Sequence, residues 1–297
     1  MANLKEIRVR IKSVKSTQQV TKAMKMVSAA KLRRAQDRII QLRPYAGKLR
    51  EIIGNVTASV DPSEIPSKLV EQREVKNTLM IVVTSNRGLA GPFNANLLKH
   101  VTGFIDENLS TDMAEGRLHF ICVGGKGYDF FKKRGANVLG DREAHDVLSD
   151  LSFERANQLV DEVFEGFESG TYDKVYLCFN EFKNVMAQNR IVENFLPVSV
   201  DGSEEEKDTV NADYIFEPDR EEILSNLIPT SLRIQFFRAV LESNAAEQGA
   251  RMVAMDSATE NAEELLKSLK LSYNKARQAA ITKEILEIAA GADALEA

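Results

Sequence analysis

The sequence predicts a fold of α plus α/β class, in which the N- and C-terminal helices form a long antiparallel coiled coil and an α/β domain is inserted between them. Three observations predict it. Residues 223–290 keep a helical pattern that holds one early proline, Pro229, and one glycine, Gly249. The first fifty residues carry a matching stripe at 3-4 spacing, and the segment between the two alternates strand-like and helix-like runs.

The C-terminal helix is far too long to lie within one compact core. About 65 residues of helix extend roughly 95 Å, at about 1.5 Å per residue. Small and apolar residues recur along its second half with charged residues between them, and they predict a narrow seam that needs a partner. The predicted seam consists of Ala258, Ala262, Leu265, Leu269, Ala276, Ala279 and Ala280.

The N-terminal helix supplies that partner. Its stripe consists of Leu4, Ile7, Ile11, Val14, Gln18, Thr21, Lys25, Ser28, Leu32, Ala35, Ile39 and Leu42. The four middle positions are polar, and over that stretch the apolar residues shift to Val20, Met24 and Val27. Such drift is expected when a helix of 3.6 residues per turn is compared with a 3.5-residue repeat. Two long helices with narrow stripes favour an antiparallel coiled coil.

The middle of the chain predicts a small Rossmann-like domain around a largely parallel sheet. Strands are expected at 79–83, 118–123 and 175–179, with an edge strand at 191–200, and helices at 93–108, 128–134 and 152–168. Pro44 and the 61–66 stretch mark the end of the N-terminal arm, and residues 201–222 form an acidic loop or hairpin. The domain boundaries follow as 1–57 and 215–297 for the coiled coil, 76–200 for the α/β domain, and 58–75 and 201–214 for linkers.

Charge is distributed unevenly along the chain. The net charge is −5, but residues 1–50 carry +12 and the remainder −17. A helix this basic repels itself unless an acidic partner lies close. Nucleic acid is one candidate, although residues 1–44 lack interleaved base-stacking aromatics and the acidic remainder speaks against it. No apolar run is long enough for a membrane span and no signal peptide is evident, so a protein kept in a reducing, cytosol-side compartment is expected.

Catalytic and metal-binding patterns do not stand out. The turns at 88–91 and 124–127 follow strands and precede helices, where a phosphate could bind, but neither completes a dinucleotide or P-loop motif. Tight structural turns are the better interpretation. Cys122 and Cys178 lie in apolar runs without metal-ligand spacing and are expected to be buried. We therefore predict no catalytic, cofactor-binding or metal-binding residue; a nucleotide-using enzyme would explain only residues 76–200.

Three long strings resemble the gamma subunits of F-type ATP synthases. They are IRVRIKSVKSTQQVTKAMKMVSAAKLRRAQ (7–36), TSNRGLAGPFN (84–94), and ARMVAMDSATENA with YNKARQAAITKEILEI within 250–290. In the central turn Asn86 stands where the family usually has Asp, and Ala90 where it usually has Cys. The dithiol insertion of chloroplast members and a transit peptide are missing, so the resemblance is to the bacterial type.

The resemblance implies a non-catalytic rotor subunit. In that family the coiled coil turns inside a ring of three alpha and three beta subunits, and the α/β domain sits with the epsilon subunit on the ring of membrane c subunits. Rotation couples proton flow to ATP synthesis or hydrolysis at beta. The resemblance further implies a peripheral protein on the cytoplasmic face of the bacterial inner membrane. Such a protein neither binds nucleic acid nor inserts directly into the membrane. Positions matching the family's contacts with beta are Met24, Lys25, Arg277, Gln278 and Thr282.

Overall fold

A computed structural model describes residues 4–57, 67–198 and 220–296. Its contacts group the chain into two compact units. We call residues 30–250 the domain unit, and residues up to 29 together with those from 251 onward the two-helix unit. The predicted acidic loop up to residue 219, the linker 201–214 and part of the linker 58–75 lie outside the described residues. The domain boundaries given by the sequence stay a prediction.

Two long helices run through both units, as the sequence predicts. Helix α1 (Leu4–Thr57) has 54 residues, and helix α6 (Arg220–Glu296) has 77. The expectation that Pro44 marks the end of the first helix is wrong, because α1 continues through it. Proline cannot donate to the carbonyl four residues earlier, here that of Ile40. Both residues are exposed, so water can take the place of the missing donor.

The domain unit contains a five-stranded sheet in the order β3-β2-β1-β4-β5. Its strands are β1 (Thr78–Val83), β2 (Leu118–Val123), β3 (Asn137–Val138), β4 (Lys174–Phe182) and β5 (Gln188–Leu196). All pairs are parallel except β4 with β5, which confirms the largely parallel sheet. The edge strand begins earlier than predicted and ends at Leu196, and β3 was missed because two residues show no periodicity.

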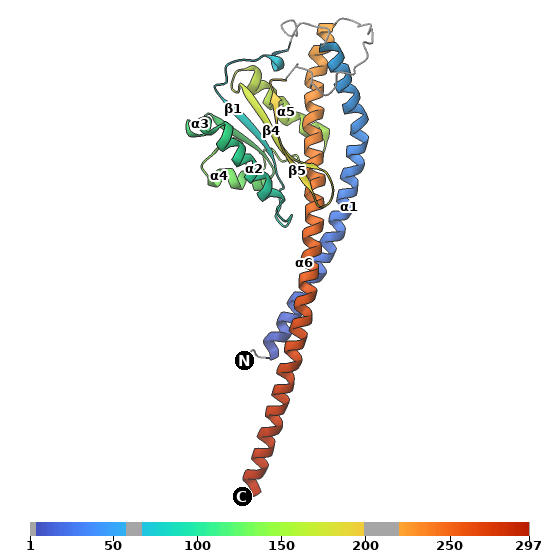
Figure 1. Ribbon diagram of the computed structural model, residues 1–297, viewed down its shortest axis with the longest axis vertical. Helices are drawn as coiled ribbons and strands as arrows, with labels where there is room; N and C mark the ends of the chain where they lie inside the picture. Colours follow the sequence, from blue (N-terminus) through green and yellow to red (C-terminus); the bar gives the residue numbers. More distant parts are fainter. Residues whose placement is uncertain (1–3, 58–66, 199–219, 297) are drawn as a thin grey trace. The chain divides into compact units, whose positions relative to one another are not determined.

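Helices cover both faces of this sheet (Figure 1). They are α2 (Phe93–Asn108), the short α3 (Ser110–Ala114), α4 (Gly125–Lys133) and α5 (Phe153–Glu168), with a 3-10 turn, η2, at Lys68–Val70. Successive strand residues point to opposite faces. Met80 and Val82 therefore pack against α2 and α4, whereas Ile81 packs on the opposite side with residues of α5 and of α6 up to Val240. The first part of α6 is thus built into the core of the domain.

The two cysteines lie in this core. Cys122 and Cys178 are buried without a disulfide, on the face covered by α2 and α4. Burial raises the pKa of the Cys122 thiol to about 12 and raises that of Cys178 as well. Because the thiolate is the reactive form, both are unreactive at neutral pH. The prediction that they are buried small hydrophobes is confirmed.

Gly249 of α6 lies under the turn that joins β4 to β5. A Cβ here would stand 3.4 Å from the Phe182 ring and 3.6 Å from the backbone of Val185, which is ordinary contact. Glycine inside a helix costs about 0.5–1 kcal/mol relative to alanine. We expect Gly249→Ala to stabilise the chain by about that amount in urea unfolding followed by circular dichroism.

Two variants calibrate this expectation. Gly103→Ala in α2 places its Cβ in open space and should show the helix effect alone. Gly249→Leu has no room beneath the turn and should lose stability instead. Destabilisation by Gly249→Ala would mean that the turn packs more tightly on α6 than described.

Candidate functional site

The crevice in which doubly wound sheets bind ligands is filled by the chain itself. Such ligands lie outside the carboxyl ends of the strands where strand order reverses, which here is between β1 and β4. At these two strand ends, the Ser243 hydroxyl donates to the Val83 carbonyl at 3.4 Å. The Phe182 amide donates to Glu242 Oε2 at 3.2 Å. Helix α6 therefore occupies the place of a ligand.

Small side chains make this close fit possible. Next to the strand ends, Ala246 and Ala250 of α6 pack against Phe93 and Ala90. Ala90 is one of the two departures from the family pattern, and its buried methyl group faces α6 at this contact. Burial raises the pKa of Glu242, although the Phe182 amide and the positive charges of Arg43 and Arg238 act against that shift.

The second glycine turn is also closed by protein groups. Gly124 has a φ of 116°, and a Cβ there would lie 2.2 Å from the Thr84 carbonyl oxygen. At the start of α4, the amide of Gly125 donates to Asn86 Oδ1 at 3.1 Å and that of Gly127 to Thr84 Oγ1 at 2.8 Å. These amides are the donors that a phosphate would need. The interpretation as a tight structural turn is confirmed.

The same contacts explain why position 86 holds Asn where the family usually has Asp. The Asn86 side chain accepts from Gly125 and donates through Nδ2 to Asp146 Oδ1 at 2.8 Å. Aspartate could accept from Gly125, but it would present a second carboxylate to Asp146. Burial acts to raise the pKa of Asp146, yet hydrogen bonds led by Ser149 and Asn86 hold it below its ordinary value. Asparagine therefore suits this loop better than aspartate does.

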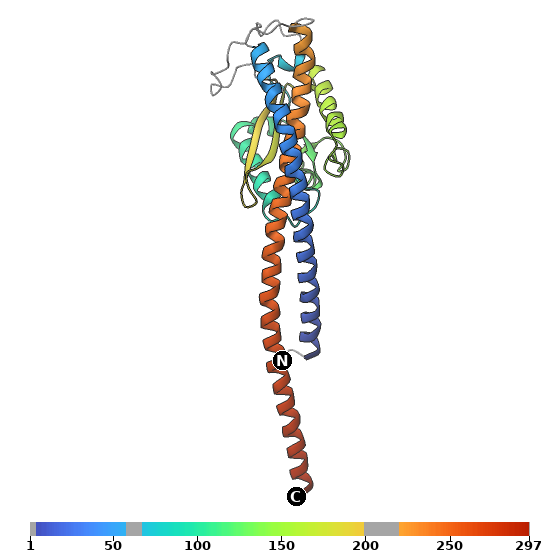
Figure 2. The same ribbon diagram turned by 90° about the vertical axis from the view of Figure 1, so that its right-hand side faces the viewer.

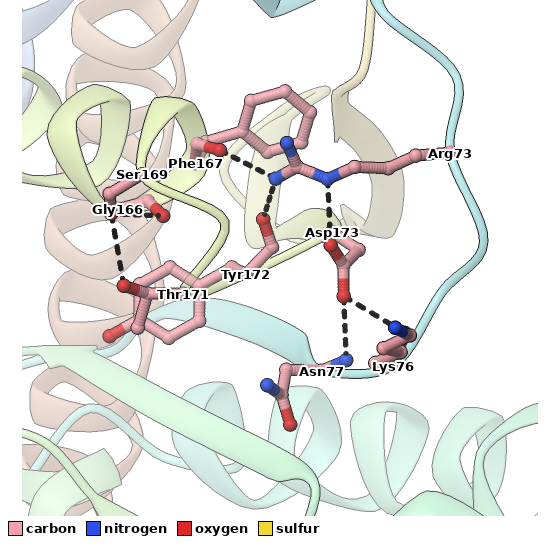
Figure 3. Close-up of polar contacts among 9 residues, drawn as sticks. All are labelled: Arg73, Lys76, Asn77, Gly166, Phe167, Ser169, Thr171, Tyr172 and Asp173. Atoms are coloured by element: carbon pink, nitrogen blue, oxygen red, sulfur yellow. Dashed lines mark hydrogen bonds and ion pairs between the residues drawn. The ribbon is translucent and has the colours of Figure 1, made fainter.

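A partly buried polar cluster fastens the segment before β1 to the turn between α5 and β4 (Figure 3). Arg73 Nε donates to Asp173 Oδ1 at 2.7 Å. Its Nη2 donates to the carbonyls of Phe167 and Tyr172, and the guanidinium lies 4.6 Å from the centre of the Phe167 ring. We call this cluster the Arg73 clasp.

Asp173 is the hub of the clasp. Its Oδ2 accepts the backbone amides of Lys76 at 2.9 Å and Asn77 at 3.0 Å (Figure 3). Burial acts to raise the pKa of Asp173, but these two amides and the Arg73 guanidinium outweigh it and hold the pKa below its ordinary value. The charged form is thus required by the fold, and the clasp is structural.

The two-helix unit is an antiparallel coiled coil, as predicted (Figure 2). Arg8 Nη2 donates to the Tyr273 hydroxyl at 2.8 Å. The hydroxyls of Thr21 and Thr259 are 2.8 Å apart. In each pair the residue numbers add to 280 or 281, so one register joins the helices. The same register sets Ile11 opposite Leu269 and Val14 opposite Leu266.

The buried face of α1 follows the predicted 3-4 stripe through its polar middle. Thr21 and Ser28 are 8% and 2% exposed, whereas Val20 and Val27 are 55% and 56% exposed. The predicted drift is therefore wrong at Val20 and Val27, whereas Met24 is half-buried. A supercoiled pair keeps its 3.5-residue repeat in contact, even where that repeat is polar.

The seam of α6 differs from the prediction in the same way. Leu266 is buried at 7% exposure, while Leu265 is 42% exposed. Ala262 and Leu269 are buried as expected, and Ala258 and Ala276 are half-buried. Ala279 and Ala280 are exposed. The predicted seam is wrong at Leu265, which lies off the heptad that runs from Met255. It is also wrong at Ala279 and Ala280, because in this register the first described residue of α1, Leu4, lies opposite Ala276.

The structure places the five predicted contact residues on two parts of this unit. Met24 and Lys25 are half-buried on α1, and Lys25 Nζ donates to Asp256 Oδ1 at 2.5 Å. Arg277, Gln278 and Thr282 are exposed on α6. The sequence pointed to Lys25 but missed Asp256; the common register, once known, would have identified it.

Beyond Ala276, helix α6 continues past the first described residue of α1 (Figures 1 and 2). The segment from Arg277 to Glu296 is about 30 Å of helix at 1.5 Å per residue. Every described side chain from 277 to 290 is exposed. They include the apolar Ile281, Ile285, Leu286 and Ile288, and an apolar group of this kind on a helix indicates a protein contact surface.

The described residues contain neither a metal-binding cluster nor a membrane-spanning helix. Within 4–57, 67–198 and 220–296, no three His, Cys, Asp or Glu side chains are grouped as a metal would require. Over the same ranges, none of the helices combines the length and the apolar character that crossing a bilayer demands.

Fold and site together define a protein whose two terminal helices form an antiparallel coiled coil and whose inserted α/β domain has its ligand crevice filled by α6. Comparison with known proteins gives the family. A family model described as ATP synthase matches residues 3–295. The chain belongs to the ATP synthase family, among its gamma chains.

The relatives match over their whole length. The gamma chain of Chloroherpeton thalassium is 52% identical over 304 residues, covering 100% of this chain and 99% of the relative. That of Chlorobaculum tepidum is 51% identical and covers 100% of both. A rotor chain of Euglena gracilis mitochondrial ATP synthase has the same fold, with a TM-score of 0.64 at 22% identity over 94% of this chain and 98% of that one.

Proposed function

We propose that this chain is the central-stalk rotor subunit of a bacterial ATP synthase and is not itself catalytic. The observation that carries the proposal is the part of α6 beyond Ala276, a helix with an exposed apolar side and a cluster of polar contact residues at its base. An exposed helix of this character needs a surrounding partner. The self-filled crevice of the α/β domain supports a mechanical role.

The proposed mechanism is differential contact. A subunit shifts a neighbour between conformations only by as much as it contacts one conformation better than another. We propose that Met24, Lys25, Arg277, Gln278 and Thr282 make such angle-dependent contacts with beta subunits. The apolar side chains from Ile281 onward then turn within an apolar collar, where few directional bonds resist rotation.

The proposed partners follow from the same assignment. Three alpha and three beta subunits surround the two-helix unit, and the epsilon subunit and the membrane c ring bind the domain unit. The chain is placed peripherally at the cytoplasmic face of the inner membrane. The basic character of residues 1–50, at +12, suits an acidic surface on beta.

A pair of matched substitutions tests the contact residues. Arg277→Leu together with Gln278→Leu removes charge-assisted hydrogen bonds of about 1.5–3 kcal/mol. We expect ATP synthesis and hydrolysis in membrane vesicles to fall roughly tenfold or more, because 1.4 kcal/mol corresponds to a factor of ten, while the complex stays assembled.

Lys283→Leu is the control. It removes one exposed cation from the same helix, about 120° round from Arg277 and about 140° round from Gln278 at 100° per residue, and should leave both activities nearly unchanged. Equal activity of the double variant and the control would remove these residues from the coupling surface.

A further inference from the structure

Four polar residues cross the seam of the two-helix unit. Thr21 and Lys25 lie on α1, one turn apart, and Thr259 and Asp256 lie opposite them on α6. Thr21 is buried and Thr259 is half-buried, and the side chains of the ion pair are 39% and 44% exposed. We call these four residues the polar layer.

The two threonine hydroxyls bond each other only when the two residues are opposite each other. Each hydroxyl also has a backbone acceptor on its own helix, Thr259 to Met255 at 2.7 Å and Thr21 to Gln18 at 3.0 Å. A hydroxyl has a single proton. One threonine therefore donates across the seam while the other donates to its own backbone, and both oxygens stay bonded.

A slip of one heptad breaks this arrangement. It would move α6 by about 10 Å and set Thr21 opposite Leu266 in one direction or Met252 in the other. Either move separates Lys25 from Asp256. The apolar layers distinguish the observed register from a slipped one less well. The slip that pairs Thr21 with Met252 sets Ile7 opposite Leu266, which is still an aliphatic contact. Buried polar positions in coiled coils specify register in this way.

We propose that the polar layer is a register lock. Its four members are positioning residues: they hold α1 and α6 at one axial offset, and thereby hold Met24 of α1 at a fixed height relative to Arg277 and Gln278 of α6. The consequence for coupling rests on the proposed function, whereas the lock itself does not.

Disulfide trapping in the full chain reports directly which residues of α1 and α6 lie opposite each other. Gln18→Cys with Ala262→Cys reports the observed register, and Gln18→Cys with Leu269→Cys or with Met255→Cys reports a slip in either direction. Cys122 and Cys178 are buried with raised pKa values and do not compete. With the polar layer intact we expect the 18–262 bond alone.

In the lock-free chain, apolar residues replace all four members of the polar layer. The substitutions are Thr21→Val and Thr259→Val, which keep side-chain shape, and Lys25→Met with Asp256→Leu. We expect slipped bonds to appear there and the ratio of native to slipped product to fall roughly fivefold or more, the effect of losing about one net hydrogen bond. Native bonds alone in that background would overturn the lock.

A charge exchange in the assembled complex keeps the proposal testable if the lock-free chain does not fold. Lys25→Asp sets two carboxylates together and should lower coupled ATP synthesis roughly fivefold. Adding Asp256→Lys re-forms the ion pair and should restore the part of the loss that comes from the register, although it does not return a cation to position 25. Loss with no rescue at all would mean that the pairing of Lys25 with Asp256 contributes nothing to coupling, which contradicts the lock and leaves the proposed contact of Lys25 with beta standing. If neither these variants nor the Arg277 and Gln278 variant changed coupling, the proposed function would fail instead.

Discussion

Gly124→Ala is expected to be among the most damaging single substitutions in the domain unit. At a φ of 116° an L-residue is strained by about 1–3 kcal/mol. The added Cβ would also stand 2.2 Å from the backbone oxygen of Thr84, and no side-chain rotation relieves that contact. We expect a loss of about 3–5 kcal/mol in urea unfolding of the full chain.

Gly88→Ala in the other glycine turn is the matched control. Its Cβ would meet the Lys126 side chain at 3.8 Å, which is ordinary contact, so the change should stay within about 0.5 kcal/mol. A Gly124→Ala chain as stable as this control would show that the turn can rearrange, and the account of α4 would then be wrong.

Removing one partner of the Arg73 clasp should lower the free energy of unfolding by about as much as Gly124→Ala does. Arg73→Leu leaves the Asp173 carboxylate buried without its guanidinium, a loss of about 3–5 kcal/mol. Asp173→Asn keeps the shape and one acceptor oxygen but cannot serve all three donors. The double variant Arg73→Leu with Asp173→Leu should recover part of the loss, because no unpaired buried charge remains. Strict additivity in this cycle would contradict the clasp.

The clasp also predicts a dependence on pH. The pKa of Asp173 is lower in the folded chain than its ordinary value, which is about 3.9 when unfolded. Its contribution is therefore complete above the unfolded pKa and is lost as pH falls through the folded pKa. The stability gap between the parent and Asp173→Asn should close over that acidic range and stay constant near neutrality.

The regular elements of this protein are predictable from local pattern. Phe93–Asn108 and Leu118–Val123 have the predicted bounds, because apolar periodicity changes sharply at a helix or strand end. The seam is less predictable. Whether Val20 or Thr21 faces the partner depends on supercoiling, a property of two helices that neither sequence segment contains alone.

The candidate site, too, was predictable only in part. The exposed positions of Arg277, Gln278 and Thr282 agree with a contact role, and that role stays a prediction. Asp256 escaped notice because its partner Lys25 lies 231 residues away. The sequence also could not predict that α6 fills the crevice. Glu242 and Ser243 look like ordinary helix residues in the sequence, and only the fold places them at the ends of β4 and β1.

The measurement that tests the central claim most directly is the subunit stoichiometry of the complex isolated through a tag on this chain, determined by native mass spectrometry. A central-stalk subunit predicts three alpha and three beta subunits for each copy of the chain, with epsilon present. Recovery of the chain without alpha and beta, or with as many copies of itself as of beta, would contradict the account.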